Sequence, residues 1–184
     1  MDMDVAWYFR VFYIYLASTA VSFLLAAIFR PKRMGTPEMT KPMRIASMVS
    51  FIGLCVWLWF IPFSIGPAFW VGLIVIILGL VVFTLGFIAM REHPEIKQVI
   101  VDWGIYKISR HSHHLAGVIM VLGVIIIGWN TQSILYLFLW LYFVLNIVFV
   151  HFSTLYEEKR DVEKFGQAYQ DYMKRVPRYF AIKR

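Results

Sequence analysis

The chain has 184 residues, of which 60% are hydrophobic and 16% charged, with a formal net charge of +7 and a mean hydropathy of +0.68. A soluble domain usually carries about 25% charged residues, so the composition excludes an ordinary soluble enzyme and indicates an integral membrane protein. The positive charge requires no nucleic-acid partner, because basic segments beside a membrane attract anionic lipid headgroups. We expect one all-α domain over residues 1–184, a polytopic bundle of membrane helices.

Membrane spans can be counted as charge-free stretches, because about 20 apolar residues of helix cross the hydrocarbon core. The 46 residues from Ile45 to Met90 carry no charge and suffice for two crossings, with Pro62, Gly66 and Pro67 marking a turn between them. Farther along, Asn130-Thr131-Gln132 marks a second turn. The sequence therefore predicts five spans, at residues 11–29, 45–61, 67–90, 113–129 and 133–152.

The fourth span is short. Its apolar run, residues 115–129, reaches only about 22 Å at 1.5 Å per residue. Its helix must therefore begin within the preceding histidine-rich stretch, near Ser109 or Ser112, which are favourable N-terminal residues.

Basic residues predict the orientation of the bundle. Of the 18 Lys and Arg residues, 17 lie between the first and second spans, between the third and fourth, or after the fifth; the exception is Arg10, which can snorkel to the opposite interface. This asymmetry predicts an outside N-terminus and a cytoplasmic C-terminus, with residues 91–114 and 153–184 on the cytoplasmic face. The single cysteine, Cys55, lies within the second span and receives no predicted role.

Two further patterns concern helix surfaces. In the tail, Val162, Phe165, Tyr169, Tyr172 and Val176 follow the 3, 4, 3, 4 spacing of one helical face. We expect an amphipathic helix there, and passive attachment to headgroups is favoured over folding back under the bundle. In the third span a small residue recurs every seven positions, which indicates close packing against another helix, either within the chain or in a homodimer; these residues are Gly72, Gly79 and Gly86.

Three histidines stand at the cytoplasmic mouth of the fourth span, and His111 and His114 are spaced to share a helical face. Such a pair can ligate zinc or iron. The chain has only 5 histidines, however, and no glutamate stands beside the pair as in an H-E-x-x-H motif. We therefore predict no bound metal.

An acidic pair, Glu157-Glu158, stands at the cytoplasmic end of the fifth span. Because the short turn makes the fourth and fifth spans a hairpin, their cytoplasmic ends should be neighbours. Carboxylates can hold an ammonium group or ribose hydroxyls, while Arg110 and protonated imidazoles can hold a carboxylate. S-adenosylmethionine carries all of these groups and is the expected cofactor.

The segments "GIYKISRH" and "YEEKRDVEKFGQAYQDYMKRVPR" resemble the isoprenylcysteine carboxyl methyltransferase and phospholipid methyltransferase group of membrane enzymes. The matching blocks cover about residues 98–120 and 153–180. Two differences stand out: Ser112-His113-His114 replaces the Pro-x-Tyr of that group, and Ala181 stands where a proline often follows the terminal aromatic residue.

The resemblance implies methyl transfer from S-adenosylmethionine to a lipid-like or isoprenoid acceptor that enters from the bilayer. It implies a cofactor pocket closed by the cytoplasmic loop and tail. For an amine acceptor, His113, His114 or a glutamate is a candidate base. Arg175 and Arg178 either face lipid, which is the favoured role, or contact an acidic acceptor head. The implied cofactor residues are Tyr106, Arg110, His111, His114, Glu157, Glu158 and Tyr169.

Two other functions fit parts of the sequence. The tail is also similar to that of sterol and steroid reductases, which use NADPH, although two adjacent carboxylates are poor neighbours for a phosphate-rich cofactor. The second alternative is a catalytically silent membrane scaffold that keeps the fold.

Overall fold

The computed structural model describes residues 10–29, 41–91, 100–130 and 133–179. Within these ranges the chain is helical, and the predicted all-α class is confirmed there; the only bridge is an isolated one between Arg10 and Pro62. The elements are α1 (Val11–Phe29), α2 (Lys41–Trp59), α3 (Pro67–Arg91), the 3₁₀ helix η2 (Gly104–Lys107), α4 (Ser112–Ile127), α5 (Ile134–Phe165) and α6 (Gln167–Arg175).

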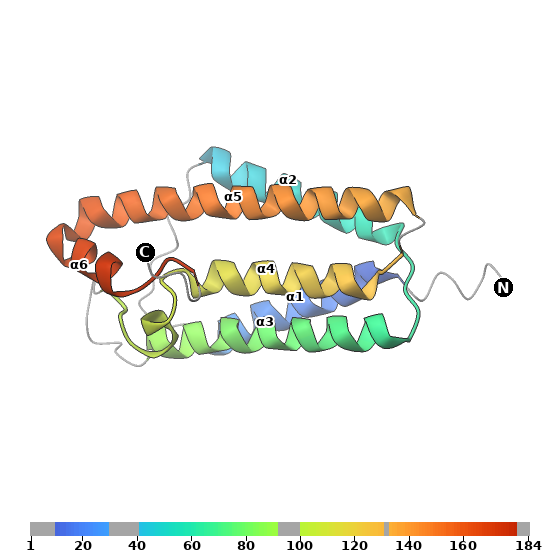
Figure 1. Ribbon diagram of the computed structural model, residues 1–184, viewed down its shortest axis with the longest axis horizontal. Coiled ribbons are helices and arrows are strands. Elements are labelled where there is room, and N and C mark those ends of the chain that lie inside the picture. The colour runs from blue at the N-terminus through green and yellow to red at the C-terminus, as the bar shows by residue number, and fades with distance from the viewer. Residues whose placement is uncertain (1–9, 30–40, 92–99, 131–132, 180–184) are drawn as a thin grey trace.

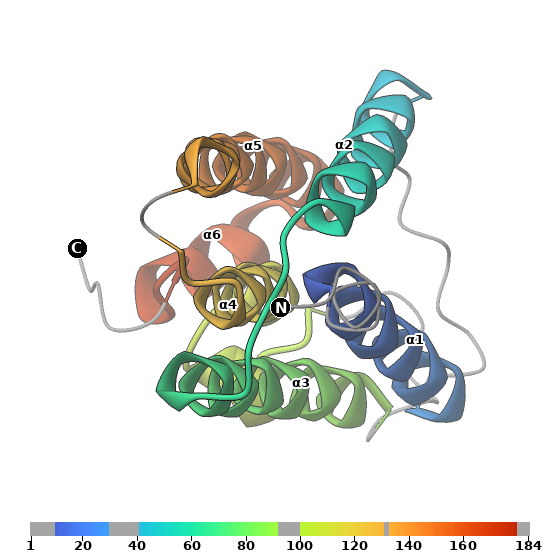
Figure 2. The same ribbon diagram turned by 90° about the vertical axis from the view of Figure 1, so that its right-hand side faces the viewer.

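Helices α3, α4 and α5 run side by side along the long axis of the molecule, and α6 lies at one end of α5 (Figure 1). The end-on view places α1, α3 and α4 together, with α2 and α5 on the other side of α4 (Figure 2). We call the end at which α4 begins and α5 ends the histidine end.

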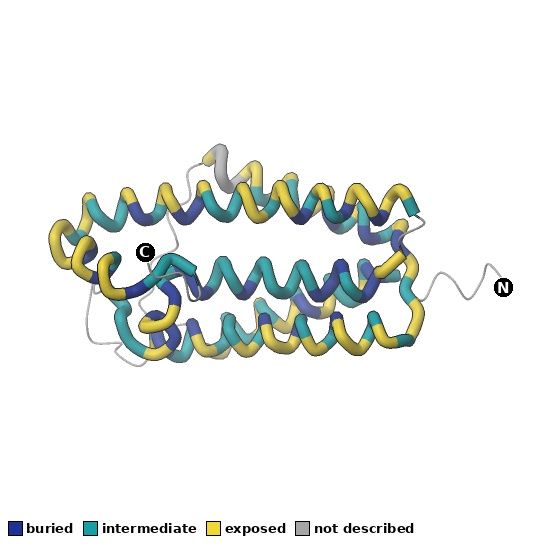
Figure 3. The backbone as a smooth tube through the Cα atoms, viewed as in Figure 1, coloured by how far each residue is buried: buried dark blue, intermediate teal, exposed yellow. Residues whose placement is uncertain are grey.

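Helix α4 is the centre of the bundle. None of its residues is exposed, whereas α1, α3 and α5 alternate buried and exposed residues along their length (Figure 3). The exposed residues of those helices include many large apolar side chains, among them Phe23, Trp70 and Phe152. Apolar surface on this scale is unfavourable in water and suits contact with lipid.

Among the described residues, three helices are long and apolar enough to cross a membrane: Val11–Phe29, Pro67–Arg91 and Ile134–Phe165. The other two apolar helical stretches are shorter, Ile45–Trp59 and Ser112–Ile127. Helix α4 begins at Ser112, one of the two predicted starts. Helix α5 extends past residue 152, where the predicted membrane span stops, and continues to Phe165, because charged residues end the apolar stretch without ending the helix.

The recurring glycines of α3 pack within the chain. A Cβ atom at Gly72 would lie 2.5 Å from the carbonyl oxygen of Gly123, and one at Gly79 would lie 3.1 Å from that of Ala116. A Cβ atom at Gly86 would lie 2.6 Å from the imidazole of His113. Small residues thus allow α3 and α4 to approach closely. Of the two predicted alternatives, close packing within the chain is confirmed, and α4 covers the face of Gly72, Gly79 and Gly86 that a homodimer would use.

At the end opposite the histidine end, α1 is held to the connection between α2 and α3. The amide of Val11 donates to the carbonyl of Ile61 over 3.0 Å, and Arg10 pairs with Pro62. Arg10 therefore lies at the far end of the bundle from the histidines, as its predicted snorkelling requires. The indole of Trp57 donates to the carbonyl of Leu135 over 2.9 Å and links α2 to the start of α5.

The predicted amphipathic helix of the tail is divided into two helices, and the favoured passive attachment to headgroups is wrong, because the predicted apolar face is buried within the chain. Gly166, with φ 59° and ψ −134°, separates α5 from α6, in a conformation that L-residues other than glycine rarely adopt. The turn folds α6 back, so that Tyr169, Tyr172 and Val176 form a buried cluster against Ile100 and Val162.

Residues 30–40 and 92–99, which belong to two of the basic segments, and Ala181 lie outside the described residues.

Candidate functional site

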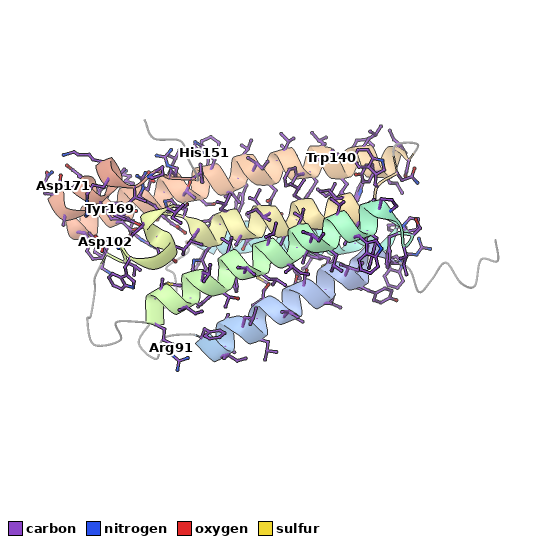
Figure 4. All side chains as sticks on the ribbon, turned by 60° about the horizontal axis from the view of Figure 1, so that its bottom comes forward. Arg91, Asp102, Trp140, His151, Tyr169 and Asp171 are labelled. Carbon is purple, nitrogen blue, oxygen red and sulfur yellow. The ribbon has the colours of Figure 1, made fainter. Side chains whose placement is uncertain are left out.

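The histidine end gathers four segments: the loop before α4, the first turn of α4, the last turns of α5, and the tail after Gly166. Figure 4 shows Tyr169, Asp102 and Asp171 together at this end, with Trp140 toward the other. Gly104 adopts φ 55°, which permits the turn that packs η2 against Ala89 of α3. The turn buries Ile105 and Tyr106 and directs the chain from Arg110 into α4.

Glu158 lies at the centre of a buried ion-pair network. Its side chain is only 5% exposed and accepts from Arg110 over 2.7 Å and from Arg178 over 2.6 Å. The Nε2 atom of His111 lies 3.3 Å from the same carboxylate. A buried carboxylate needs such partners because the loss of hydration is costly. Two guanidinium groups supply them here.

Glu157 has different partners. Its Oε2 atom lies 3.0 Å from Nε2 of His114 and 3.5 Å from Nδ1 of His111. His111 is buried between the two carboxylates, whereas His114 and Glu157 remain 27% and 29% exposed. The predicted meeting of the histidines with the acidic pair is therefore confirmed, and Glu157 is the carboxylate that solvent reaches.

These contacts shift the pKa values of the acidic pair and of His111. Burial raises the pKa of Glu157, but hydrogen bonds from His111 and His114 outweigh it and leave that pKa well below its ordinary value. Burial likewise raises the pKa of Glu158, and His111, Arg178 and Arg110 together lower it. For His111 burial lowers the pKa, while Glu157 and Glu158 raise it above its ordinary value. Both carboxylates are ionised at neutral pH.

The tail is fixed to the loop before α4 through backbone groups. The guanidinium of Arg110 donates to the carbonyl oxygens of Met173 and Val176, and the hydroxyl of Ser109 donates to the carbonyl of Arg178 over 3.0 Å. The amide of Arg110 also donates to the carbonyl of Pro177. Arg110 thus links α5, the tail and the loop, which identifies it as a positioning residue.

A second pair on the loop and α4 points toward α3. The hydroxyl of Tyr106 lies 2.7 Å from Nδ1 of His113, and the imidazole packs edge-on against Phe83 and Phe87. The Nε2 atom of His113 is buried and has no hydrogen-bond partner among the described residues. His113 therefore faces the loop and α3, whereas His114 faces Glu157 of α5.

Two other predicted site residues lie apart from the histidine and carboxylate contacts. Arg175 is 66% exposed and pairs with Asp102 over 3.2 Å, so its position gives no support to a catalytic role. Tyr169 is buried in the tail cluster. Burial and the negative charges of Asp161 and Glu158 raise the pKa of Tyr169. Tyr169 therefore lies near these two acidic residues.

Sequence reasoning missed the contacts through which several residues assemble the site. Arg178 is a principal partner of Glu158, and Tyr172 donates to the carbonyl of Tyr106 over 2.9 Å. The tail motifs contain both residues, but spacing along the chain does not reveal partners on another segment. Ser109 left no sequence signal beyond its preference for helix starts.

The structure supplies the acidic residue that the sequence pattern for a metal site lacked. The sequence lacks a glutamate beside the histidine pair, but α5 supplies Glu157, and the ligand atoms of His111, His114 and Glu157 all lie within 4.8 Å of one another. These three residues can hold a metal ion.

An open depression of about 420 Å³ lies between α5 and the tail. Glu158 contributes to its wall, so the network borders both this depression and the histidines. Its other lining residues are Leu155, Lys159, Val162, Glu163 and Met173.

Comparison with known proteins leaves the activity open. No curated protein and no solved structure matches the chain. One family model, described as a protein of unknown function (DUF1295), matches residues 4–176. The match extends from before α1 through α6 and so includes the whole histidine end except its last residues. The chain belongs to the DUF1295 family.

Proposed function

We propose that the protein transfers a methyl group from S-adenosylmethionine to a lipid-like or isoprenoid acceptor at the cytoplasmic membrane face. The observation that carries the proposal is the state of Glu157, an ionised and partly exposed carboxylate whose partners are the two imidazoles of His111 and His114. Glu158, by contrast, is occupied by two guanidinium groups.

The cofactor's polar groups match this set of side chains. The carboxylate of Glu157 can accept hydrogen bonds from an α-ammonium group or from ribose hydroxyls. Protonated His111 or His114 can donate to the α-carboxylate. Glu158 is paired with both Arg110 and Arg178, so we assign to these three residues the positioning of the loop and tail rather than direct contact with the cofactor.

Methyl transfer needs alignment more than it needs acid or base catalysis. The acceptor displaces the sulfonium sulfur in line, and the positive charge is lost as a neutral thioether leaves. Holding the two reactants in an attack geometry contributes up to about 7–11 kcal/mol. A carboxylate acceptor requires no base. An amine acceptor must lose a proton, and for that case we assign His113 as the base.

The proposed orientation follows the distribution of basic residues, with the N-terminus outside and the histidine end in the cytoplasm. The proposed cofactor, a cytosolic metabolite, fits this orientation, and Arg10, the one exception in the distribution of basic residues, lies at the far end of the bundle. The apolar exterior of the helices suits an acceptor that enters sideways from the bilayer.

The pairing of the arginines favours a methyltransferase over a reductase. A dinucleotide phosphate needs cationic partners, but Arg110 and Arg178 are both bound to Glu158, and Glu157 adds a further negative charge to the site. Removing either arginine from Glu158 would leave a buried carboxylate undercompensated.

Ligand binding to the full chain in detergent tests the proposal. We expect S-adenosylhomocysteine to bind and to raise the unfolding temperature, and Glu157→Gln to weaken binding about 10- to 100-fold, since a hydrogen bond to a charged group contributes about 1.5–3 kcal/mol. Asp171→Asn, which alters an exposed carboxylate of α6, is the matched control. Unchanged affinity in Glu157→Gln, or stabilisation by NADPH alone, would contradict the proposal. A folded protein that binds neither ligand would support the scaffold.

A further inference from the structure

Two contacts within the group of His111, His114 and Glu157 have the spacing of metal ligands, and all three ligand atoms lie within 4.8 Å of one another. In a tetrahedral zinc site, with bonds of about 2.0–2.1 Å to nitrogen and oxygen, neighbouring ligand atoms lie about 3.3 Å apart. Here Oε2 of Glu157 lies 3.0 Å from His114 Nε2 and 3.5 Å from His111 Nδ1. An ion could therefore enter with small side-chain movements.

A second observation concerns the other ring nitrogen of His111. A histidine that binds a metal usually donates its remaining N–H group to a carboxylate, which fixes the ring and its tautomer. While Nδ1 faces Glu157, Nε2 lies 3.3 Å from Glu158 Oε1. Arg110 and Arg178 in turn hold Glu158. The carboxylate that would orient His111 is thus already held in place by two arginines.

The exposure of the three side chains also suits an ion. His111 is 5% exposed, while His114 and Glu157 are 27% and 29% exposed. One side of the group is therefore buried and ordered, and the other is open to solvent. Three protein ligands with an accessible fourth position are the arrangement of zinc sites that bind water or another ligand.

We propose that His111, His114 and Glu157 form a binding site for a divalent transition metal of the zinc class, with Glu158 orienting His111. The ligand set, two imidazoles and one carboxylate, disfavours Mg²⁺ and Ca²⁺, which prefer all-oxygen coordination. Binding of the ion requires these three side chains and does not require the adenosyl cofactor. A consequence that rests on the proposed function is that zinc and the adenosyl cofactor exclude each other, because both need Glu157 and the two imidazoles.

The position of His114 gives the sharpest variant. The resembling methyltransferase group carries tyrosine there, so His114→Tyr removes one metal ligand and keeps an aromatic hydrogen-bonding side chain. Glu157→Gln removes the charged ligand. His151→Gln is the matched control, since His151 is a partly exposed histidine of α5 that contacts Tyr179 instead of this group.

The experiment measures Zn²⁺ binding to the full chain in detergent, after treatment with a chelator, by calorimetry and by metal analysis. We expect one ion per chain in the wild type and in His151→Gln, and at least about a tenfold loss of affinity in His114→Tyr and in Glu157→Gln. Gel filtration checks that each variant is folded, and His114→Gln replaces His114→Tyr if that variant aggregates. Equal affinity in the ligand variants and the control, or no stoichiometric zinc in the wild type, would overturn the proposal.

A second titration separates this proposal from the methyltransferase proposal. Zinc should raise the apparent dissociation constant of S-adenosylhomocysteine in the wild type, and His114→Tyr should abolish that effect. Zinc binding without any binding of S-adenosylhomocysteine keeps the metal site and rejects the cofactor. Binding of S-adenosylhomocysteine without zinc rejects the metal site and keeps the cofactor.

Discussion

At the scale of single residues, the two adjacent glutamates of α5 have unlike surroundings. Glu158 is buried with two arginines and one imidazole, while Glu157 contacts imidazoles only and remains accessible. Consecutive helical residues point about 100° apart, so one faces the tail and loop while the other faces the start of α4. We therefore propose a positioning role for Glu158 and a ligand-binding role for Glu157, although the residue type is the same.

Removing the charge of Glu158 should destabilise the protein more than removing that of Glu157. Glu158→Gln leaves two guanidinium groups without their anion, and breaking a buried ion pair in this way costs about 3–5 kcal/mol. Thermal unfolding in detergent measures the difference, with the exposed Asp171→Asn as a control that leaves the midpoint unchanged. Equal loss in the Glu157 and Glu158 variants would contradict the division of roles.

Stability should depend on pH through the same residues. The folded-state pKa of His111 is raised above its ordinary value of 6.5, so its contribution is complete below pH 6.5 and is lost as the pH rises through the raised pKa. The pKa values of Glu157 and Glu158 are lowered from 4.5, so their contribution is complete above pH 4.5 and is lost on acidification. We expect the cluster to contribute most between these values.

Unfolding midpoints over a pH series test this expectation. His111→Asn should flatten the decline on the alkaline side and leave the loss in acid, because the carboxylates keep Arg110, Arg178 and His114 as partners. If the unfolding midpoint of His111→Asn falls as much at alkaline pH as that of the wild type, other groups cause the decline.

At the scale of elements, the pairing of α3 with α4 is set by small residues. Gly72 and Gly123 bring the two backbones together, and His113 occupies the space that Gly86 leaves. The position of α4 along α3 therefore determines where the histidines lie. The glycine spacing in the sequence indicated a close helix contact, but it could not say which helix makes it.

Adding one methyl group at this contact should destabilise the bundle. In Gly72→Ala the new Cβ atom would lie 2.5 Å from the carbonyl oxygen of Gly123, so backbone atoms must move, at a cost of about 1–3 kcal/mol for an overpacked core. Gly53→Ala in α2 is the matched control, because its Cβ atom would meet nothing within 4 Å. Melting curves in detergent should show a lower midpoint for Gly72→Ala alone; similar midpoints for both variants would rule out the close contact.

At the scale of the whole molecule, the structure separates an apolar bundle from a polar histidine end. Large apolar side chains are exposed along α1, α3 and α5, while the ion pairs gather beyond the ends of α3 and α4. A bilayer around the apolar part leaves the histidine end on one face and the connection between α2 and α3 on the other.

Cysteine labelling in intact cells tests the proposed orientation. In a Cys55→Ala background, a membrane-impermeant maleimide should modify Ser64→Cys from outside and should modify Gln170→Cys only after lysis. Both positions are exposed, so accessibility depends on the side of the membrane. Labelling of Gln170→Cys in intact cells would reverse the orientation.

The sequence by itself determined the helical class, the beginning of the first and third helices, the start of α4 at Ser112 and the meeting of the histidines with the acidic pair. Each follows from local chemistry: hydropathy, proline, helix-start preference and a short hairpin turn. Only the tertiary structure decided that α4 covers the glycine face and that Gly166 folds the tail inward. It also decided that two arginines occupy Glu158 and that Glu157 completes a three-ligand group with His111 and His114. These outcomes depend on side chains from segments far apart in the chain, whose directions are fixed by packing and not by sequence spacing.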